Sequence, residues 1–269
     1  MQISMTNPEQ WRYNSVLLVE TLLGMISRCE IFNNGVIIEG QQLKGVFSMK
    51  GSEILAHVDH TLLKPTATWA EIQELCEQAI VYKTASICIP PCYIKHIQEI
   101  YGSTINICTV IGFPLGYETT VSKVAAARQA VKDGASEIDM VINTPDAKNG
   151  DYEQITAEIA AMKKAVGKKI LKVIVEACYL TDEEKIAMCR AVTEAGADFI
   201  KTSTGFGTGG ATHADVQLFR AHIGPKVKIK AAGGIRTIED MKQYIAEGCS
   251  RLGASAAVKL LKDKLDLEV

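Results

Sequence analysis

From about residue 54 onward, strand-like runs rich in β-branched residues alternate with segments of helical periodicity. The runs begin roughly every 20 to 35 residues, which is the length of one strand, one helix and two short loops. Eight such units without a break favour an α/β fold, a (β/α)8 TIM barrel with a short N-terminal extension, over a doubly wound sheet. The runs are EILAHVDH (53–60), TASICI (84–89), INICTVIGF (105–113), SEIDMVIN (136–143), KILKVIVEA (169–177), ADFIKTS (197–203), KVKIKAAGG (226–234) and SRLGAS (250–255).

The segments between these runs have the periodicity of helices. Apolar residues recur at spacings of three and four in TWAEIQELCEQAIVY (68–82), TDEEKIAMCRAVTEAG (181–196) and TIEDMKQYIAEG (237–248). The last two begin with a threonine followed by acidic residues and end near Gly196 and Gly248, which are typical start and stop residues. These patterns predict the helices that connect parallel strands.

Residues 1–48 lie outside the alternating pattern and are expected to form an extension, with 49–269 as the catalytic barrel. NSVLLVETLLGMISRC (14–29) has the pattern of an amphipathic helix, and IFNNGVIIE (31–39) contains an Asn-Gly turn typical of a hairpin. The extension would cap the barrel or join an oligomer interface. Alternatively Met49 is the biological start, and the sequence does not separate these possibilities.

The bulk composition excludes several classes of protein. A net charge of -2 lacks the basic surface of a nucleic-acid-binding protein. No apolar run approaches the roughly 20 residues that span a bilayer, so no membrane association is expected. The eight cysteines are scattered among apolar runs, which favours reduced thiols and a cytoplasmic location.

Charged residues recur at positions where a barrel interior is expected. Alternate residues of a barrel strand point inward, and active sites use the C-terminal strand ends. The interior charges would come from Asp139, Lys172 with Glu176, Lys201, and Lys228 with Lys230. A satisfied polar network is one explanation, since an interior charge is costly unless it is paired. Several lysines converging on one barrel mouth favour a chemical role instead.

Two neighbouring lysines and an aspartate suit Schiff-base chemistry. A free lysine has a pKa near 10.4, so only about one in 2,500 is neutral at pH 7, whereas attack on a carbonyl needs the neutral amine. A second ammonium and desolvation lower a lysine pKa toward working pH. A nearby aspartate can then hold the supporting lysine and pass protons.

Small residues follow the seventh and eighth runs. Loops in this position are the usual phosphate site of a TIM barrel, and backbone N–H groups there can face an anion. The phosphate-binding candidates are therefore Gly233, Gly234, Gly253 and Ser255.

The segment Gly205-x-Gly207-x-x-Gly210 matches a dinucleotide fingerprint, but its context does not. That fingerprint normally opens the first βα unit and is followed about 20 residues later by an acid for the ribose. Here it follows the sixth run, and Lys230 stands about where the acid would be. We therefore expect these glycines to make room near a phosphate rather than to bind a nicotinamide cofactor.

Six motifs follow one another along the chain. They are DHTLLKP (59–65), CTVIGFPLG (108–116), GASEIDMVIN (134–143), LKVIVEACYLTDEEK (171–185), ADFIKTSTGFGTGGAT (197–212) and KAAGGIRTIEDM (230–241). In this order they resemble the motifs of the deoxyribose-phosphate aldolase family. The resemblance covers about residues 50 to 262 and implies a metal-free class I aldolase that needs no cofactor. It implies reversible cleavage of 2-deoxy-D-ribose 5-phosphate to acetaldehyde and D-glyceraldehyde 3-phosphate, a lyase reaction of deoxyribose phosphate catabolism.

The resemblance also implies roles for individual residues. Lys201 matches the Schiff-base lysine, Lys230 the second lysine that perturbs it, and Asp139 the interior aspartate of the proton relay. The positions that match residues lining the substrate pocket are Asp59, Thr61, Lys172 and Thr204.

The sequence departs from the family pattern at two places. Phe206 stands where some members have a lysine that helps to hold phosphate, so backbone groups of Gly205 and Gly207 are expected to carry more of that work. The tail LKDKLDLEV lacks the tyrosine that some members use as a proton carrier, which leaves Asp139, Lys230 and water.

Two rival readings remain open beside this aldolase. One is another sugar-phosphate barrel enzyme, either a different Schiff-base aldolase or a metal-free isomerase. The other is a non-catalytic sugar-phosphate-binding protein, which would gain nothing from depressing a lysine pKa. The expected partners are a small phosphosugar and aldehydes, and the family resemblance implies a homodimer or homotetramer.

Overall fold

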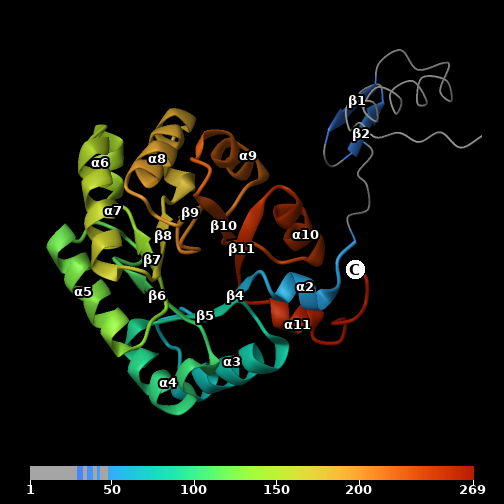
Figure 1. The fold of residues 1–269 in the computed structure, drawn as a ribbon, viewed down its shortest axis with the longest axis horizontal. Coiled ribbons are helices and arrows are strands. Elements are labelled where there is room, and N and C mark those ends of the chain that lie inside the picture. The colour runs from blue at the N-terminus through green and yellow to red at the C-terminus, as the bar shows by residue number, and fades with distance from the viewer. Residues whose placement is uncertain (1–28, 33–34, 39–40, 43–47) are drawn as a thin grey trace, which may run out of the picture. The chain divides into compact units, whose positions relative to one another are not determined.

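The computed structural model describes residues 29–32, 35–38, 41–42 and 48–269. The chain divides into two compact units, Met1–Phe47 and Ser48–Val269 (Figure 1). In the first unit, the strands β1 (Cys29–Phe32), β2 (Gly35–Ile38) and β3 (Gln41–Gln42) pair in sequence order as an antiparallel sheet. The β1–β2 pair lies where a hairpin is expected. The helix expected over 14–29 falls almost entirely outside the described residues.

The second unit is a closed barrel of parallel strands, as the alternating pattern predicts. Its order is β10-β11-β4-β5-β6-β7-β8-β9, so each strand pairs with its neighbours in sequence and the last pairs with the first. This confirms the (β/α)8 barrel and rules out the doubly wound alternative. The strands are β4 (Val58–Thr61), β5 (Ser86–Ile89), β6 (Ile107–Ile111), β7 (Glu137–Val141), β8 (Ile170–Ile174), β9 (Phe199–Lys201), β10 (Lys228–Ala232) and β11 (Cys249–Ala254).

Helices surround the barrel, and the predicted helix starts are confirmed. The hydroxyls of Thr68, Thr181 and Thr237 each accept a hydrogen bond from the backbone N–H three residues later, which satisfies a free donor of the first turn. The helices are α2 (Gly51–Leu55), α3 (Trp69–Tyr82), α4 (Ile94–Tyr101), α5 (Thr120–Asp133), α6 (Thr144–Asn149), α7 (Tyr152–Val166), α8 (Asp182–Glu194), α9 (His213–His222), α10 (Ile238–Ala246) and α11 (Ala257–Leu261), with short 3₁₀ turns at η1 (Pro91–Tyr93), η2 (Gly102–Thr104) and η3 (Ala177–Tyr179).

The first predicted strand is partly wrong. The run 53–60 divides between the end of α2 and the start of β4 at Val58. The Glu53 carboxylate accepts a hydrogen bond of 2.9 Å from the backbone N–H of Lys50, which starts the helical turn. Ile54 and Leu55 are consecutive and both fully buried. A short apolar run of this kind cannot be assigned to strand or helix by periodicity alone.

The apolar core lies between the barrel wall and the surrounding helices, while the barrel interior is largely polar. Outward-facing strand residues such as Ile138, Val173 and Ile200 are fully buried in this layer. A small second apolar cluster of Cys88, Cys108 and Val110 lies on the inward face of β5 and β6. The remaining inward positions are therefore free for charged side chains.

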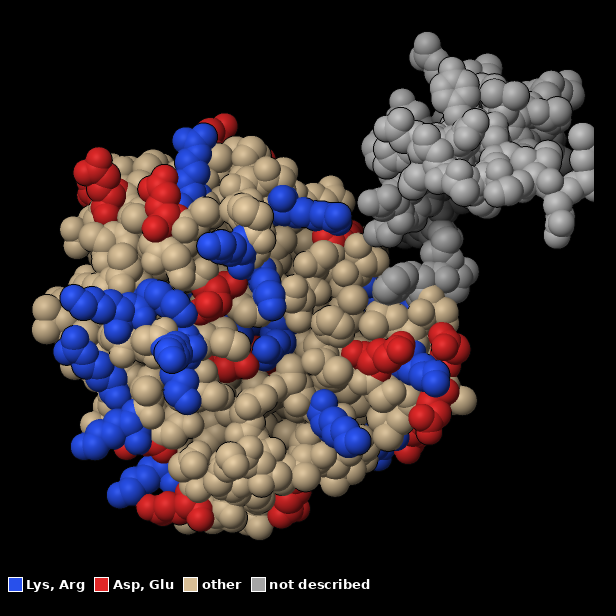
Figure 2. Space-filling view, viewed as in Figure 1, with Lys and Arg blue, Asp and Glu red and all other residues tan. Residues whose placement is uncertain are grey.

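The surface carries both signs of charge. Figure 2 shows acidic and basic side chains interspersed on the visible face, with Lys and Arg most frequent on the side where Figure 1 draws α5. Within the described ranges, no helix has the length and hydropathy needed to cross a membrane.

Candidate active site

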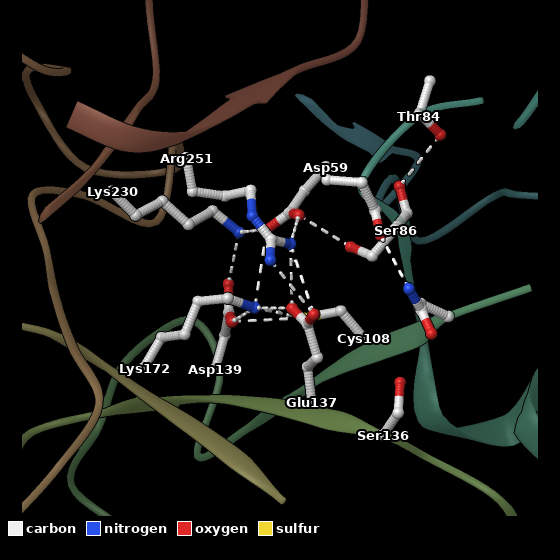
Figure 3. Close-up of polar contacts among 12 residues, drawn as sticks. Asp59, Thr84, Ser86, Cys108, Ser136, Glu137, Asp139, Lys172, Lys230 and Arg251 are labelled. Carbon is white, nitrogen blue, oxygen red and sulfur yellow. Dashed lines mark hydrogen bonds and ion pairs between the residues drawn. The ribbon is translucent and has the colours of Figure 1, made fainter. Parts of the chain in front are cut away.

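Charged side chains from β4, β7, β8, β9, β10 and β11 meet inside the barrel, and Figure 3 labels all of them except Lys201 of β9. They face inward because alternate residues of each strand point to the same side, and the register brings them level: Asp139 pairs with Lys172, and Lys230 with Lys201. All are almost completely buried except Arg251, whose side chain is 12% exposed. We call this set the interior cluster; its members are Asp59, Glu137, Asp139, Lys172, Lys201, Lys230 and Arg251.

Asp139 is the centre of the cluster. Its Oδ2 accepts hydrogen bonds from the Nζ atoms of Lys201 and Lys230, each at 2.7 Å. Its Oδ1 accepts from Lys172 Nζ at 2.9 Å and from the Cys108 thiol at 3.1 Å. One carboxylate thus joins three lysines, and the two predicted catalytic lysines share a single oxygen atom.

Asp59 and Glu137 hold the other side of the cluster. Lys230 Nζ lies 2.5 Å from Asp59 Oδ2, and the Ser86 hydroxyl donates to Asp59 Oδ1 at 2.7 Å. Lys172 Nζ lies 2.5 Å from Glu137 Oε2 and 3.5 Å from Asp59 Oδ2. Arg251 contacts both Asp59 and Glu137. Each carboxylate therefore has at least two cationic partners.

These contacts keep two of the carboxylates and two of the lysines ionised. Burial alone would raise the carboxyl pKa values, but nearby cations hold the pKa of Asp139 well below its usual range and also lower that of Asp59. Burial alone would lower the lysine pKa values, but Asp139 and Asp59 raise the pKa of Lys172 and of Lys230 above the usual range. Lys230 is therefore a charged neighbour of Lys201, as the Schiff-base prediction requires.

Two residues predicted among the interior charges do not join the cluster. Lys228 is exposed, because it is the first residue of β10 and lies at the N-terminal end of the barrel. Glu176 is buried but lies beyond the end of β8, where it accepts a hydrogen bond of 3.2 Å from the Thr204 backbone N–H and contacts the Thr204 hydroxyl. The alternation rule does not say where a strand ends, so it places both residues wrongly.

The glycine loops after β9 and β10 pack backbone against backbone. Gly233 has a φ of +81°, and a Cβ built on it would lie 3.3 Å from the Gly205 Cα and 3.1 Å from the Gly210 Cα. A Cβ on Gly210 would lie 2.3 Å from the Gly233 carbonyl oxygen. Gly234 also has a positive φ, of +79°. Gly210 of the GxGxxG segment is therefore needed for this close approach, whereas a Cβ on Gly207 would lie 3.0 Å from the Cys178 Sγ.

Gly253 makes room for a catalytic candidate. A Cβ on this residue would lie 2.9 Å from the Ala232 Cβ and 3.3 Å from the Lys230 Cε. Ser255 is exposed and precedes α11, which has five residues. Loop backbone near Ser255, rather than a long helix, would therefore face an anion there.

Phe206 forms an aromatic contact across the barrel mouth. Its ring lies 5.3 Å from the Phe113 ring in an edge-to-face arrangement, although its side chain remains about half exposed. Phe113 in turn packs on the inward-facing apolar cluster of β5 and β6. The loops after β6 and β9 are thus joined at the position where some family members have a phosphate-binding lysine.

Two buried polar atoms lie just beyond the C-terminal ends of β7 and β9. Ser203 Oγ and Asn143 Oδ1 are buried and have no hydrogen-bond partner among the described residues. The Thr61 hydroxyl donates to the backbone carbonyl of Asp59 at 2.8 Å. Sequence reasoning missed Ser203 and Asn143, although they alternate with Lys201 and Val141.

Sequence reasoning also missed Glu137 and Arg251. Both could have been found by the rule that identified the others: Glu137 shares a face with Asp139, and Arg251 shares one with Gly253. Both precede the C-terminal ends of their strands, where the active site of such a barrel is expected.

Two groups of ligand atoms are close enough to hold a metal ion in the described part of the chain. They are Cys88, Cys108 and Asp139, and Asp59, Cys108 and Glu137. Every carboxylate in these groups already contacts a lysine or arginine. A metal cation would have to displace those cations, so the donor set does not fit a metal.

Comparisons with known proteins agree with this geometry. A family model described as DeoC/LacD family aldolase matches residues 53–263. The deoxyribose-phosphate aldolase of Clostridium botulinum (strain Alaska E43 / Type E3) is 66% identical over 214 residues, covering 80% of this chain and 97% of that protein. The enzyme of that name from Clostridioides difficile (strain 630) is 54% identical over 78% of this chain and 96% of its own length.

Solved structures give the same result. The aldolase QR15 has a TM-score of 0.75 and 35% identity, covering 78% of this chain and 95% of that chain. A tetrameric deoxyribose phosphate aldolase from Aeropyrum pernix has a TM-score of 0.72 and 29% identity, covering 81% of this chain and 93% of its own. The barrel, the buried lysines and these relatives agree, and the chain belongs to the DeoC/LacD family of aldolases.

Proposed function

We propose that this aldolase reversibly cleaves 2-deoxy-D-ribose 5-phosphate to acetaldehyde and D-glyceraldehyde 3-phosphate through a Schiff base on Lys201. The relatives that carry this enzyme name support the substrate, since they match nearly their whole length. The geometry of Lys201 supports the mechanism.

The position of Lys201 carries the proposal. It is the last residue of β9, so its amine lies at the end of the barrel where active sites of this fold are built. Among the three clustered lysines, Lys201 contacts one carboxylate, Lys230 two and Lys172 three. Lys201 therefore loses the fewest ionic contacts when it gives up a proton and becomes a nucleophile.

The reaction can be followed by its bonds. The neutral amine of Lys201 attacks C1 of the open-chain sugar, and loss of water gives a protonated imine. Removal of the proton from the C3 hydroxyl breaks the C2–C3 bond, which releases glyceraldehyde 3-phosphate and leaves an enamine on Lys201. Protonation of the enamine carbon and addition of water then release acetaldehyde and restore the amine.

The neighbours of Lys201 have distinct roles in this scheme. Asp139 Oδ2 contacts both Lys201 and Lys230, so it can carry a proton between them or to water. The charged Lys230 disfavours a second ammonium beside it. Asp59, Thr61, Lys172 and Thr204 line or support the substrate pocket.

The glycine loops would hold the phosphate of the substrate. Gly205, Gly207, Gly233 and Gly234 belong to the loops after β9 and β10, and Ser255 follows β11. Their backbone N–H groups are the donors expected for an anion at this end of a TIM barrel. Gly253 contributes by leaving space for Lys230.

Reductive trapping tests the mechanism. Borohydride added with acetaldehyde reduces a Schiff base to a stable ethyl-lysine, and peptide mass mapping then locates it. We expect the label on Lys201 and none in a Lys201→Ala variant. A label on Lys172, or full activity of Lys201→Ala, would show that this assignment is wrong.

A substrate panel separates the proposal from another sugar-phosphate aldolase or an isomerase. Turnover of 2-deoxyribose 5-phosphate is compared with that of other pentose and hexose phosphates, with acetaldehyde release as the readout. We expect 2-deoxyribose 5-phosphate to have the highest kcat/KM. Isomerisation without aldehyde release would support the rival reaction.

We also infer that the barrel works as a homodimer or homotetramer in the cytoplasm. The tetrameric relative from Aeropyrum pernix supports self-association. The seven cysteines within residues 48–269 are free thiols, as in proteins of a reducing compartment. Native mass measurement gives the oligomeric state, and a purely monomeric protein at assay concentration would contradict the inference.

Residues 49–269 are proposed to be the catalytic unit, since the family match begins at residue 53. A chain that starts at Met49 should keep the kcat and KM of the full chain. A large fall in kcat on removal of residues 1–48 would give the extension a role in the site.

A further inference from the structure

The side of the interior cluster formed by Arg251 and Glu137 has no role in the scheme above. Arg251 donates to Glu137 from Nη1 at 3.0 Å and from Nη2 at 3.2 Å, and it also contacts Asp59 (Figure 3). Glu137 lies 2.5 Å from Lys172, and Asp59 lies 2.5 Å from Lys230. The pair is thus joined to the lysines through carboxylates on both sides.

The charges joined by these contacts do not balance. The cluster has four cationic side chains, three lysines and Arg251, against the three carboxylates of Asp59, Glu137 and Asp139. An uncompensated charge in a buried site is costly, so loss of one proton from a lysine brings the cluster to neutrality. Arginine keeps its proton in proteins. The proton that the cluster loses must therefore come from a lysine.

We propose that Arg251 is a positioning residue whose fixed positive charge, held by Glu137 and Asp59, forces one lysine of the cluster to be neutral and so keeps Lys201 available as the nucleophile. This rests on the proposed Schiff-base function. Arg251 acts through the shared carboxylates and does not contact the substrate.

The other groups that face this interior are two thiols, a hydroxyl and Glu176 at its mouth, and none of them forms an ion pair with a lysine or arginine of the cluster. The Cys108 thiol donates a hydrogen bond to Asp139, and burial raises its pKa well above the usual value. A hydrogen bond with the Cys108 thiol lowers the pKa of the Cys88 thiol below its usual value, and the charges of Lys230 and Lys201 act in the same direction. Ser86 contributes a neutral hydroxyl. Glu176 makes its contacts with Thr204 instead, and Lys228 is exposed.

The test is the pH dependence of kcat/KM for 2-deoxyribose 5-phosphate. The rate should rise with pH as the nucleophilic lysine loses its proton, which defines the midpoint of an acid limb. Arg251→Met removes one positive charge, so we expect the midpoint to move up by about one pH unit, with a roughly tenfold lower kcat/KM below it. Glu137→Gln removes one negative charge and should move the midpoint down by a similar amount.

Two further variants separate charge from structure. In the double variant Arg251→Met/Glu137→Gln the charge excess is the same as in the wild type, so the midpoint should return toward the wild-type value. Arg251→Lys keeps a positive charge and should leave the midpoint near that of the wild type even if kcat falls.

Lys228 offers a matched control. Its Nζ and the Arg251 Cζ both lie 5.8 Å from the centre of the Phe199 ring, but Lys228 has no contact with the cluster carboxylates. Lys228→Met should leave the midpoint unchanged. A shift as large as that of Arg251→Met would show that any nearby cation has the effect and would overturn the proposal.

The outcomes distinguish the proposed role of Arg251 from the Schiff-base function on which it rests. A fall in kcat with an unmoved midpoint in both Arg251→Met and Glu137→Gln would give the pair a purely structural role and overturn the inference. If Arg251→Met yields no soluble protein, Glu137→Gln decides, because its predicted shift has the opposite sign. Trapping of acetaldehyde on wild-type Lys201 is measured in parallel; its failure would overturn the Schiff-base function itself.

Discussion

Two regions of the molecule bury lysines completely, and they use them differently. Lys123 of α5 donates to Glu158 of α7 and to the Val141 carbonyl, both at 2.9 Å, so it pairs with a single carboxylate. Lys172 and Lys230 inside the barrel share several carboxylates in a cluster with more cations than anions.

The pKa directions reflect this difference. Burial raises the pKa of Glu158 despite the opposing effect of Lys123, whereas the cations around Asp139 overcome burial and lower its pKa. A one-to-one buried pair can join two helices. An excess of cations around a carboxylate leaves one amine whose proton is dispensable, which is the arrangement that nucleophilic chemistry needs.

The same substitution in both regions should have opposite consequences. Lys201→Met removes the nucleophile, so we expect kcat to fall by roughly 1,000-fold or more. Asp139 retains two other lysine partners, so the melting temperature should change little. Steady-state assays and thermal unfolding check both statements, and substantial residual aldol cleavage would contradict the comparison.

Lys123→Met should damage the fold and spare the chemistry. The thioether replaces the aliphatic stem but leaves Glu158 buried without its cation, and removing one partner of a buried pair typically costs about 3 to 5 kcal/mol. Urea unfolding measures that loss. The kcat of the folded fraction should stay within about twofold of the wild type, and a second substitution, Glu158→Leu, should recover stability.

Glycine-to-alanine substitutions beside the two buried lysines test the same difference with smaller expected effects. A Cβ on Gly253 would press on Lys230 Cε at 3.3 Å, and one on Gly112 would press on Lys123 Cε at 2.9 Å. Overpacking of this kind typically costs about 1 to 3 kcal/mol. We expect Gly253→Ala to lower kcat through Lys230. Gly112→Ala should mainly lower the free energy of unfolding, with added strain because φ at Gly112 is +65°. Equal effects of the two variants on kcat would remove the distinction.

The smallest expected effect is the change in the free energy of unfolding with pH. This change should have opposite signs for the carboxylates of the two regions. The lowered pKa values of Asp59 and Asp139 mean that their contribution is present above about pH 4 and is lost as the pH falls below it. The raised pKa of Glu158 means that its contribution falls as the pH rises above about 4.

Urea unfolding of two variants over the acidic range checks these signs. Asp139→Asn should flatten the loss of stability below about pH 4, since it removes a carboxylate of lowered pKa. Glu158→Gln should make stability rise more steeply above about pH 4 than in the wild type. The reverse slopes would contradict the assigned directions.

Much of the fold follows from local pattern. The alternation of strand-like and helical segments predicts the closed barrel, and threonine caps such as Thr181 and Thr237 predict where helices start. The first predicted strand shows where local pattern is insufficient. Residues 53–55 look like strand by composition but form part of α2, because burial of Ile54 and Leu55 is satisfied equally by a helical turn.

The candidate site was predicted in part. Lys201, Lys230, Asp139 and Asp59 meet as expected, but their catalytic roles stay predictions until the trapping and kinetic tests are done. Glu176 and Lys228 were placed inside the cluster although one lies beyond a strand end and the other at its exposed start. Glu137 and Arg251 were missed because both precede the C-terminal ends of their strands, where an active site is expected, and their pairing joins residues 114 positions apart.

The sequence by itself determined the barrel and its inward-facing charged positions, because both depend on periodicities of two and 3.6 residues along the chain. Only the tertiary structure decided which charges share an oxygen atom, how many cations surround each carboxylate, and hence which lysine can lose its proton. Those properties depend on strand register and on desolvation by the closed barrel. Folding, and not spacing along the sequence, brings the charged atoms to within 2.5 to 3 Å of one another, where Coulomb interactions are strong.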